Sequence, residues 1–366
     1  MKKKKIVIFI PSVEDGGVEK NFFLISNYLS KFYNDISIIT ADKSIKKYLS
    51  KKIKLITPSS NNWKKKSRYS KFFICSLYLF KFLVSNKDVL IFSFQGNAYA
   101  TILAKLFGNK NITRSNSSSE GWSKNYIKKI LYKIILNLSD RVIVNSYQFK
   151  KELDKKFGIN SCAIYNPLNI RHIKSKSKEK INFKFFKGNY LKIITIGRLV
   201  DQKDHFTMLK SINLLDKKNV RLLIIGRGEN REKLIEYIKQ NKLNSKIKLI
   251  PFQKNPYKYL RLADIFLFSS KFEGLPNVLL EAQCLKKYII SSNCPTGPKE
   301  ILLNGKAGDL VPIGDYKKLS DKINKYNKKN IYYKRKILLG YKKLYRFDYK
   351  YNMKKYYNSI KKFIYI

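Results

Sequence analysis

Residues 268–315 read FSSKFEGLPNVLLEAQCLKKYIISSNCPTGPKEILLNGKAGDLVPIGD, and within them Glu273 and Glu281 have seven residues between them. Gly274 and Pro276 interrupt regular structure after the first carboxylate, and the apolar run that follows begins a helix. A helix that starts from such a turn presents backbone N–H groups and positive potential, which suit an anionic ligand. One carboxylate then lies on the loop before the anion and the other on the helix behind it. The stretch therefore predicts a site that grips the hydroxyls of a phosphorylated sugar.

Short apolar runs alternate with longer amphipathic segments in two blocks of the chain. This alternation predicts an α/β protein with two doubly wound parallel sheets, and ligands of such folds bind beyond the carboxyl ends of the strands, here in a cleft between two domains. The expected strands are 6–10, 36–39, 53–56, 89–92 and 142–144 in the first block, and 193–196, 222–225, 247–250, 265–268 and 288–291 in the second.

The two blocks are separated by a polar, basic stretch over 166–189 that has no strong periodicity. We expect an N-terminal domain on the acceptor side over 1–170, a linker over 171–189 and a C-terminal nucleotide-binding domain over 190–345. A last helix over 346–366 is expected to pack back onto the N-terminal domain. A length of 366 residues gives both domains room for a core of their own.

Four cysteines lie far apart and form no CxxC pair, which favours free thiols in a reducing compartment and disfavours a zinc site. The start, MKKKKIVIFIPS, has too few apolar residues before its proline for the core of a signal peptide. It is better interpreted as a first buried strand. We therefore expect a cytoplasmic protein.

A net charge of +52 points to an anionic partner, either nucleic acid or a membrane surface. Only 11 of the 77 basic residues are Arg, the better reader of phosphates and bases, which argues against nucleic acid. Lys occurs with many Ile, Asn, Tyr and Phe residues, whose codons are all rich in A and T. Genome composition and attraction to anionic lipid both remain explanations of the excess.

Two segments combine basic and aromatic residues with a strongly apolar body. They are 63–84, which starts with Trp63 and the lysines 64–66, and 122–138. Both are too short and too charged to span a bilayer. Each is either an ordinary helix with an apolar core face or a helix that lies in the membrane interface.

The stretch around Glu273 and Glu281 resembles the E-x7-E signature of retaining glycosyltransferases of family 4, which have the GT-B fold. IGRLVDQKDHFTMLKSI at 196–212 resembles the donor-phosphate element of that family. Residues 222–238 resemble the strand, loop and helix that follow it, and residues 11–29 resemble its N-terminal glycine loop. The resemblance is specific in the C-terminal half and looser between residues 40 and 165.

The resemblance assigns a role to each candidate residue. Glu273 would hold donor-sugar hydroxyls, Glu281 would accept hydrogen bonds from the ribose, and Arg198 and Lys203 would stabilise the diphosphate as it leaves. Transfer would retain the anomeric configuration, with the departing phosphate oxygen taking the acceptor proton. Further donor contacts are expected at Gly16, Gly17, Gly226, Phe252, Gln253, Leu275, Pro276, Asn277 and Val278.

Some expected motifs are absent. The sequence holds no Asp-x-Asp pair for a divalent cation and no G-x-x-x-x-G-K-[ST] loop, which fits a transferase without a metal. Many members of the family carry a His in the N-terminal domain near the sugar and acceptor, but this chain has none there. A polar loop over 113–117 is expected in its place, with Arg114 and Asn116 on the acceptor side. His205 is better interpreted as a hydrogen-bonding loop residue than as a general base.

The resemblance, together with these observations, implies a metal-independent glycosyltransferase, peripheral on the inner face of the cytoplasmic membrane. It would move a hexose or N-acetylhexosamine from a nucleotide-sugar, expected to be UDP-linked, to a lipid-linked or polysaccharide acceptor in lipopolysaccharide, capsule or O-antigen synthesis. Nucleic acid is not expected as a partner, and no cofactor is expected. The alternatives are a sugar-nucleotide epimerase of the same fold, a basic nucleic-acid-binding protein and a non-catalytic membrane scaffold.

Overall fold

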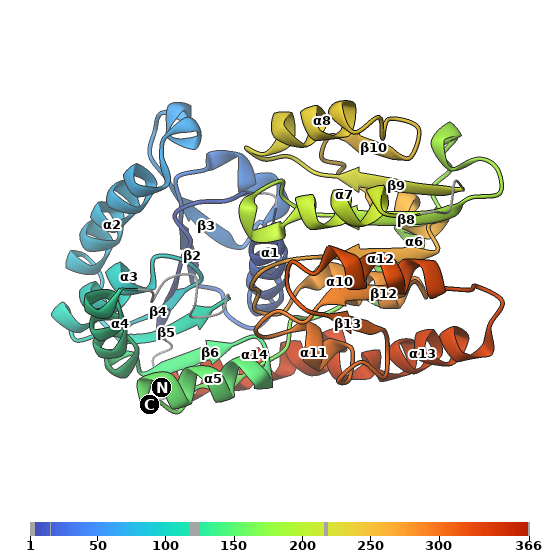
Figure 1. The fold of residues 1–366 in the computed structure, drawn as a ribbon. Coiled ribbons are helices and arrows are strands. Elements are labelled where there is room, and N and C mark those ends of the chain that lie inside the picture. The colour runs from blue at the N-terminus through green and yellow to red at the C-terminus, as the bar shows by residue number, and fades with distance from the viewer. Residues whose placement is uncertain (1–3, 15, 117–124, 216–218, 365–366) are drawn as a thin grey trace. The chain divides into compact units, whose positions relative to one another are not determined.

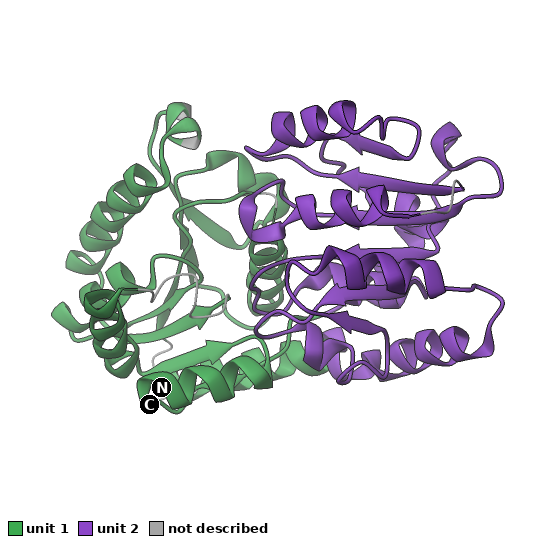
Figure 2. Ribbon diagram, viewed as in Figure 1, with its two compact units in different colours: residues 1–167, 350–366 green, residues 168–349 purple. Residues whose placement is uncertain are grey.

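The computed structural model describes residues 4–14, 16–116, 125–215 and 219–364. The chain divides into two compact units (Figure 2). Met1–Pro167 and Lys350–Ile366 make the first unit, and Leu168–Tyr349 makes the second. The end of the chain thus belongs to the same unit as its beginning.

The first unit is built on a seven-stranded parallel sheet with the strand order β3-β2-β1-β4-β5-β6-β7 (Figure 1). The side chains of β4, and all but the first of β1, are buried, as is typical of a parallel sheet covered on both faces. The strands are β1 (Lys5–Phe9), β2 (Ile36–Ile39), β3 (Ile53–Ile56), β4 (Val89–Ser93), β5 (Lys110–Ser115), β6 (Arg141–Val144) and β7 (Cys162–Ala163).

Helices cover this first sheet. Cys75, Leu79 and Leu83 of α2 pack with two alanines of α3 against Val7 and Phe9 of β1. The helices of the unit are α1 (Gly17–Leu29), α2 (Arg68–Val84), α3 (Asn97–Leu106), α4 (Tyr126–Leu138), α5 (Tyr147–Phe157) and α14 (Tyr349–Ile364), with 3-10 helices at Lys43–Tyr48 and Asn61–Lys65.

The sequence predicts one helix over 63–84, but the structure divides this segment into two helices. The Ser67 hydroxyl accepts a hydrogen bond from the backbone N–H of Ser70, so it caps α2, which begins at Arg68. Trp63 lies instead in the preceding 3-10 helix. The second such segment, 122–138, begins outside the described residues, and its described part forms α4.

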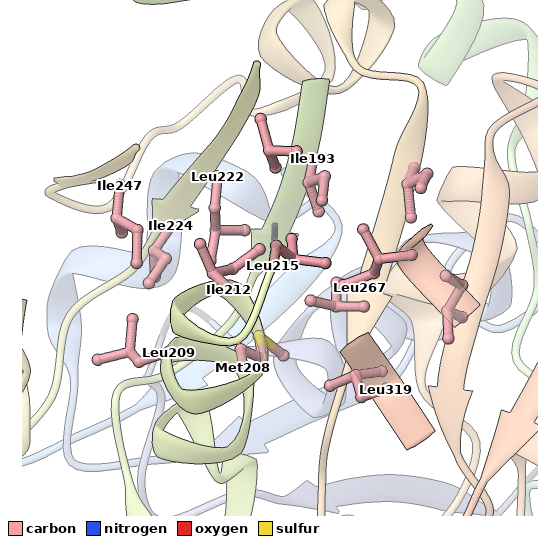
Figure 3. Close-up of a cluster of buried hydrophobic side chains, with 14 of the residues drawn as sticks. Ile193, Met208, Leu209, Ile212, Leu215, Leu222, Ile224, Ile247, Leu267 and Leu319 are labelled. Atoms are coloured by element: carbon pink, nitrogen blue, oxygen red, sulfur yellow. The ribbon is translucent and has the colours of Figure 1, made fainter. Parts of the chain in front are cut away.

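The second unit holds a six-stranded parallel sheet in the order β10-β9-β8-β11-β12-β13. Figure 3 shows its core, in which Ile193, Leu222 and Leu267 from neighbouring strands meet Met208 and Leu319 from two helices. The strands are β8 (Leu191–Ile196), β9 (Val220–Ile225), β10 (Ile247–Ile250), β11 (Ile265–Phe268), β12 (Tyr288–Ser292) and β13 (Asp309–Val311). The α-helices are α6 (Ile170–Ser177), α7 (His205–Asn213), α8 (Arg231–Gln240), α9 (Tyr257–Leu262), α10 (Asn277–Cys284), α11 (Pro298–Ile301), α12 (Tyr316–Lys325) and α13 (Ile331–Lys342).

The prediction of two doubly wound parallel sheets is confirmed, and each predicted strand is present. The sequence did not predict β5, β7 and β13. β5 reads KNITRS and contains no apolar run, while β7 and β13 have only two and three residues. The range 171–189, expected as a linker, contains most of α6, and the Ser177 carbonyl in it accepts a hydrogen bond from Arg261 Nε at 2.8 Å.

Gly226, at the end of β9, is needed because another part of the backbone lies against it. A Cβ at this position would lie 2.0 Å from the carbonyl oxygen of Gly197, which follows β8. This approach joins two loops of the protein, so it explains Gly226 without the nucleotide contact that the sequence predicts for it. A Cβ at Gly228 would lie 2.3 Å from the carbonyl oxygen of Leu199.

We expect Gly226→Ala to lower the free energy of unfolding by about 1–3 kcal/mol or more, because the backbone must move to admit the methyl group. Gly197→Ala is the matched control, since its nearest contact would be Lys203 Cε at 3.8 Å, an ordinary van der Waals distance. Urea unfolding of both variants measures the difference. Equal stability of the two would contradict the explanation.

Candidate functional site

The candidate residues of the second unit lie in loops at the carboxyl ends of its strands, except for those on α10, which follows one of these loops. Because the strands are parallel, the loops that follow β8, β9, β11 and β12 leave the sheet at the same edge. β8 has β9 on one side and β11 on the other, so the strand order reverses there. Ligands of open α/β sheets bind at such a switch point, beyond the carboxyl ends of the strands.

The loop after β8 is fastened to the loop after β11 by hydrogen bonds. The buried hydroxyl of Ser269 lies 2.8 Å from the carbonyl oxygen of Lys203 and 2.7 Å from that of Asp204. Gln202 Nε2 donates to the carbonyl of Phe272 at 2.8 Å. These contacts hold the backbone on both sides of the candidate catalytic residues.

Lys203 and Glu273 form an ion pair across these two loops. Lys203 Nζ lies 2.5 Å from Glu273 Oε1, and the side chains are only 16% and 11% exposed. The ammonium group also lies 5.4 Å from the ring centroid of Phe268, a cation–π distance. The carbonyl of Glu273 accepts a hydrogen bond from the Thr296 hydroxyl. The structure thus brings two of the three predicted catalytic residues into direct contact.

The turn between Glu273 and α10 is packed against the loop after β12. Gly297 has a φ of +81°, and a Cβ there would lie 2.4 Å from the carbonyl oxygen of Gly274 and 2.6 Å from Pro276 Cδ. Pro276 is the N-cap residue of α10, and its own side chain makes no capping hydrogen bond. The predicted donor residues Leu275 and Val278 lie on either side of this junction, next to Asn277, the first residue of α10.

Glu281 lies one turn into α10, as the sequence predicts, and it is buried. Its Oε1 accepts a hydrogen bond from the hydroxyl of Tyr257 on α9 at 3.3 Å. This contact links α10 to α9 and adds a phenol to the candidate site. The ribose contact of Glu281 stays a prediction.

The third predicted catalytic residue, Arg198, is exposed in the loop after β8. Beyond β10, Phe252 is 38% exposed and lies 5.2 Å from the guanidinium of Arg227. Gln253 Oε1 accepts a hydrogen bond from the hydroxyl of Tyr259 at 3.4 Å. An exposed aromatic ring beside a cation is able to stack with a base, so Phe252 stays a candidate for the nucleoside.

In the first unit, a carboxylate occupies the glycine loop. The N–H of Gly16 donates to Glu19 Oε2 at 3.2 Å, and Gln95 Nε2 donates to Glu19 Oε1 at the same distance. Glu19 is buried at the N-terminus of α1, where its charge repels an anion. In this structure the Gly16 N–H therefore already has an acceptor, and its contact with the donor stays a prediction. The role of Gly17 stays a prediction.

The sequence predicts that Arg114 lies in a polar loop, but in the structure it lies near the end of β5. Its side chain is fully buried, with Nε 2.9 Å from the hydroxyl of Tyr356 on α14 and Nη2 2.7 Å from Asn166 Oδ1. These contacts favour a structural role that joins α14 to the sheet. Asn116 follows the strand, and its Nδ2 donates to the carbonyl of Phe94 at 3.1 Å. Its acceptor contact stays a prediction.

Several residues of this site carry no signal in the sequence. Three of them donate side-chain hydrogen bonds to backbone carbonyls far away in the chain, namely Ser269, Gln202 and Thr296. The hydroxyl of Tyr257 donates to Glu281 from another helix. Only Gly297 has a local signal, since a Gly-Pro pair after an apolar strand marks a turn.

His205 is enclosed at the start of α7. Burial, with a smaller effect of the positive charge on Lys203, lowers the pKa of its imidazole to about 4. The side chain is therefore neutral at physiological pH, and it is only 3% exposed. An imidazole with so low a pKa is a weak base, and a buried one does not reach a substrate, so both observations argue against a general base at this position.

Two negative findings apply to the described residues. Within them, no three His, Cys, Asp or Glu side chains cluster in a way that would hold a metal ion. None of the helices over 4–14, 16–116, 125–215 and 219–364 is both long and apolar enough to cross a bilayer.

Comparisons with known proteins match this chain to glycosyltransferases. Residues 176–342 match the family model described as "Glycosyl transferases group 1". An uncharacterized glycosyltransferase of Methanocaldococcus jannaschii is 33% identical over 217 residues, which are 55% of this chain and 53% of that protein. The chain thus spans about half the length of this relative. The "GalNAc-alpha-(1->4)-GalNAc-alpha-(1->3)-diNAcBac-PP-undecaprenol alpha-1,4-N-acetyl-D-galactosaminyltransferase" of Campylobacter jejuni is 28% identical, over 87% of this chain and 88% of that protein.

The fold has solved counterparts. The crystal structure of HepE from Anabaena in complex with UDP-glucose has a TM-score of 0.79 at 16% identity, over 98% of this chain and 99% of that chain. A glycosyltransferase from Rickettsia africae has a TM-score of 0.79 at 19% identity and covers both chains completely. These likenesses confirm the predicted GT-B fold. With the sequence matches, they support a glycosyltransferase.

His205 predicts a particular pH dependence of stability. Since its folded pKa of about 4 lies below the usual 6.5, its contribution is complete above pH 6.5 and is lost as the pH falls through 4. We expect the wild type to lose up to about 3 kcal/mol more than His205→Gln on acidification from neutral pH. Unfolding by urea at a series of pH values measures both. Parallel pH profiles of the two proteins would show that the imidazole is not held neutral by burial.

Proposed function

We propose that this chain is a retaining, metal-independent glycosyltransferase of family 4 that builds a cell-surface glycan. It moves a hexose or N-acetylhexosamine from a UDP-linked donor to a lipid-linked or polysaccharide acceptor. The observation that carries this proposal is the ion pair of Lys203 and Glu273 at the switch point of the second sheet, beside the N-terminus of α10. It places a cation, a carboxylate and a helix N-terminus together, as a bound sugar diphosphate requires.

Two of the similar proteins support the choice of donor and acceptor. The name of the Campylobacter relative includes a PP-undecaprenol-linked glycan, and HepE binds UDP-glucose in its crystal structure. The amylovoran biosynthesis glycosyltransferase of Erwinia amylovora, which is 26% identical over 81% of this chain, supports a role in polysaccharide synthesis.

The two residues of the ion pair bind different parts of the donor. Lys203 donates one N–H to Glu273 Oε1 and keeps two for phosphate oxygens, and Arg198 adds a second cation from the same loop. Glu273, held by Lys203 and by the Thr296 contact to its carbonyl, accepts hydrogen bonds from sugar hydroxyls. Both cations compensate the negative charge that grows on the leaving diphosphate.

In the reaction, the bond from the anomeric carbon to the diphosphate oxygen breaks, and a bond to the acceptor oxygen forms on the same face. The acceptor proton passes to the departing phosphate oxygen. This route needs no strong base from the protein, which agrees with a buried, neutral His205. Glu281 and Phe252 are left for the ribose and the base.

We expect Glu273→Gln to abolish transfer almost completely while UDP still binds, because the lost charge acts on the sugar and not on the nucleotide. The assay follows labelled sugar from a panel of UDP-sugars into undecaprenyl-diphosphate-linked acceptors. A thermal-shift titration with UDP checks binding. Glu236→Gln, which changes an exposed carboxylate of α8, is the matched control.

Wild-type rates from the Glu273→Gln protein, with its unfolding midpoint unchanged, would refute the role of this carboxylate. Retention is read from the anomeric configuration of the product by NMR. Conversion of the donor sugar without acceptor would favour the epimerase.

We expect Arg198→Ala and Lys203→Ala each to reduce kcat/KM on the order of a hundredfold and to shrink the thermal shift by UDP, because a preorganised cation on the diphosphate is lost. Lys239→Ala, at an exposed position on α8, is the matched control and should keep both properties.

EDTA should leave the wild-type rate unchanged, because the two cations replace a metal. A strict requirement for added Mg²⁺ or Mn²⁺ would contradict this division of work. Unchanged UDP binding in both alanine variants would contradict the proposal that this loop binds the diphosphate.

A further inference from the structure

Helices α2, α3 and α4 of the first unit expose an unusual amount of apolar surface. They have 17, 10 and 13 residues, yet they carry more than half of the large apolar side chains that are exposed in the described part of the chain. We call this set the three-helix apolar face. Its residues are Tyr69, Phe73, Leu77, Phe80, Val84, Tyr99, Ile102, Leu106, Tyr126, Ile127, Ile130, Leu131, Ile134 and Leu138.

The apolar side chains of α2 do not all serve the core of the unit. Cys75, Leu79 and Leu83 are buried against the sheet. Phe73, which is 65% exposed, belongs to a second series with a spacing of three or four residues, so it lies on another face of the helix. In α4 only Leu136 is buried among the residues that the structure describes. The core therefore accounts for one face of these helices and leaves the other without an explanation.

The three helices form one continuous layer. Figure 1 shows α2, α3 and α4 one after another in the first unit, and α3 contacts both of its neighbours. The rings of Phe72 on α2 and Tyr99 on α3 meet edge to face with centroids 6.0 Å apart. The hydroxyls of Thr101 on α3 and Ser139 at the end of α4 lie 3.3 Å apart. An apolar area of this extent on a monomeric protein marks an interaction site.

The charge around the face identifies the chemistry of the partner. None of the three helices holds an Asp or Glu. They hold seven Lys or Arg residues, namely Arg68, Lys71, Lys81, Lys105, Lys128, Lys129 and Lys133. Of these, Lys105 forms an ion pair with Asp140, which follows α4. A partner of this face therefore needs an apolar interior to bury these side chains and negative charges at its surface to pair with the basic residues. A bilayer with anionic headgroups has that arrangement, with aromatic rings at headgroup depth.

We infer that the three-helix apolar face binds an anionic membrane surface, with α2, α3 and α4 lying in the interface and their lysines among the headgroups. This inference rests on the proposed function, because a lipid-linked acceptor requires the enzyme to work at a bilayer. It also goes further than the sequence analysis, since it adds α3 and joins α2 and α4 through it into one surface. None of these helices crosses the membrane.

The first test removes apolar side chains that do not serve the core. Phe73→Gln with Ile127→Gln changes two residues that are 65% and 66% exposed, on α2 and α4. We expect partitioning onto phosphatidylglycerol-containing vesicles to fall by about tenfold or more, because the bilayer no longer buries these groups. Ile331→Gln with Leu338→Gln, on α13 of the second unit and 60% and 45% exposed, is the matched control and should bind like the wild type.

The second test removes charge. Replacing Lys128, Lys129 and Lys133 of α4 by Gln should weaken binding by about fivefold for each lysine, and added salt should weaken the wild type in the same way. The control replaces three exposed lysines of the second unit, Lys233, Lys239 and Lys317. Vesicles of phosphatidylcholine alone should bind the wild type poorly.

Vesicle sedimentation needs neither donor nor acceptor, so its result is independent of the transferase assay. The thermal shift by UDP should be the same in all four variants. No sedimentation of the wild type with anionic vesicles, or equal sedimentation of the wild type and Phe73→Gln with Ile127→Gln, would overturn the inference. A wild-type dimer that this pair of substitutions dissociates, without vesicle binding, would assign the face to a second copy of the chain and would also overturn it.

Discussion

The candidate site depends on hydrogen bonds that fasten the loop after β8 to the loop after β11. Ser269 holds two backbone carbonyls of the first loop, and Gln202 holds a carbonyl of the second. Without these contacts, Lys203 and Glu273 would sit on two independent loops, and their ion pair would have to order both at a large cost in entropy. With them, the pair needs only to order two side chains.

Close backbone packing extends this arrangement to the neighbouring loops. Gly226 lies against the loop after β8, and Gly297 lies against the turn that leads into α10. Side chains at either position would push apart loops that belong to adjacent strands. The four loops thus form one support, in which glycines make contact with the protein's own backbone. A glycine near a candidate phosphate site is therefore no evidence by itself that a ligand approaches it.

The surroundings of the basic residues differ between the two units. In the second unit, Lys203 is paired with Glu273, and Lys336 bonds Asp309, so cations near the sheet have acidic partners. In the first unit, Lys105 of α3 pairs with Asp140, but α2, α3 and α4 themselves contain no acidic residue and expose apolar side chains between their lysines. A genome rich in A and T would give an excess of lysine along the whole chain, but it would not gather exposed phenylalanine and isoleucine with that lysine on three adjacent helices.

The sequence by itself determined the two parallel sheets, since buried runs such as 36–39 and 265–268 are apolar at every or nearly every position, and this pattern is local. It also placed Glu273 and Glu281 on either side of a helix start. Tertiary structure decided what those residues touch, because Ser269, Thr296 and Tyr257 reach them from distant parts of the chain. Arg114 is a second example. The polar sequence of β5 predicts a loop, and the contact that buries Arg114 comes from α14, more than 200 residues later in the chain. Local patterns encode which segments are buried, and only packing decides which side chains meet.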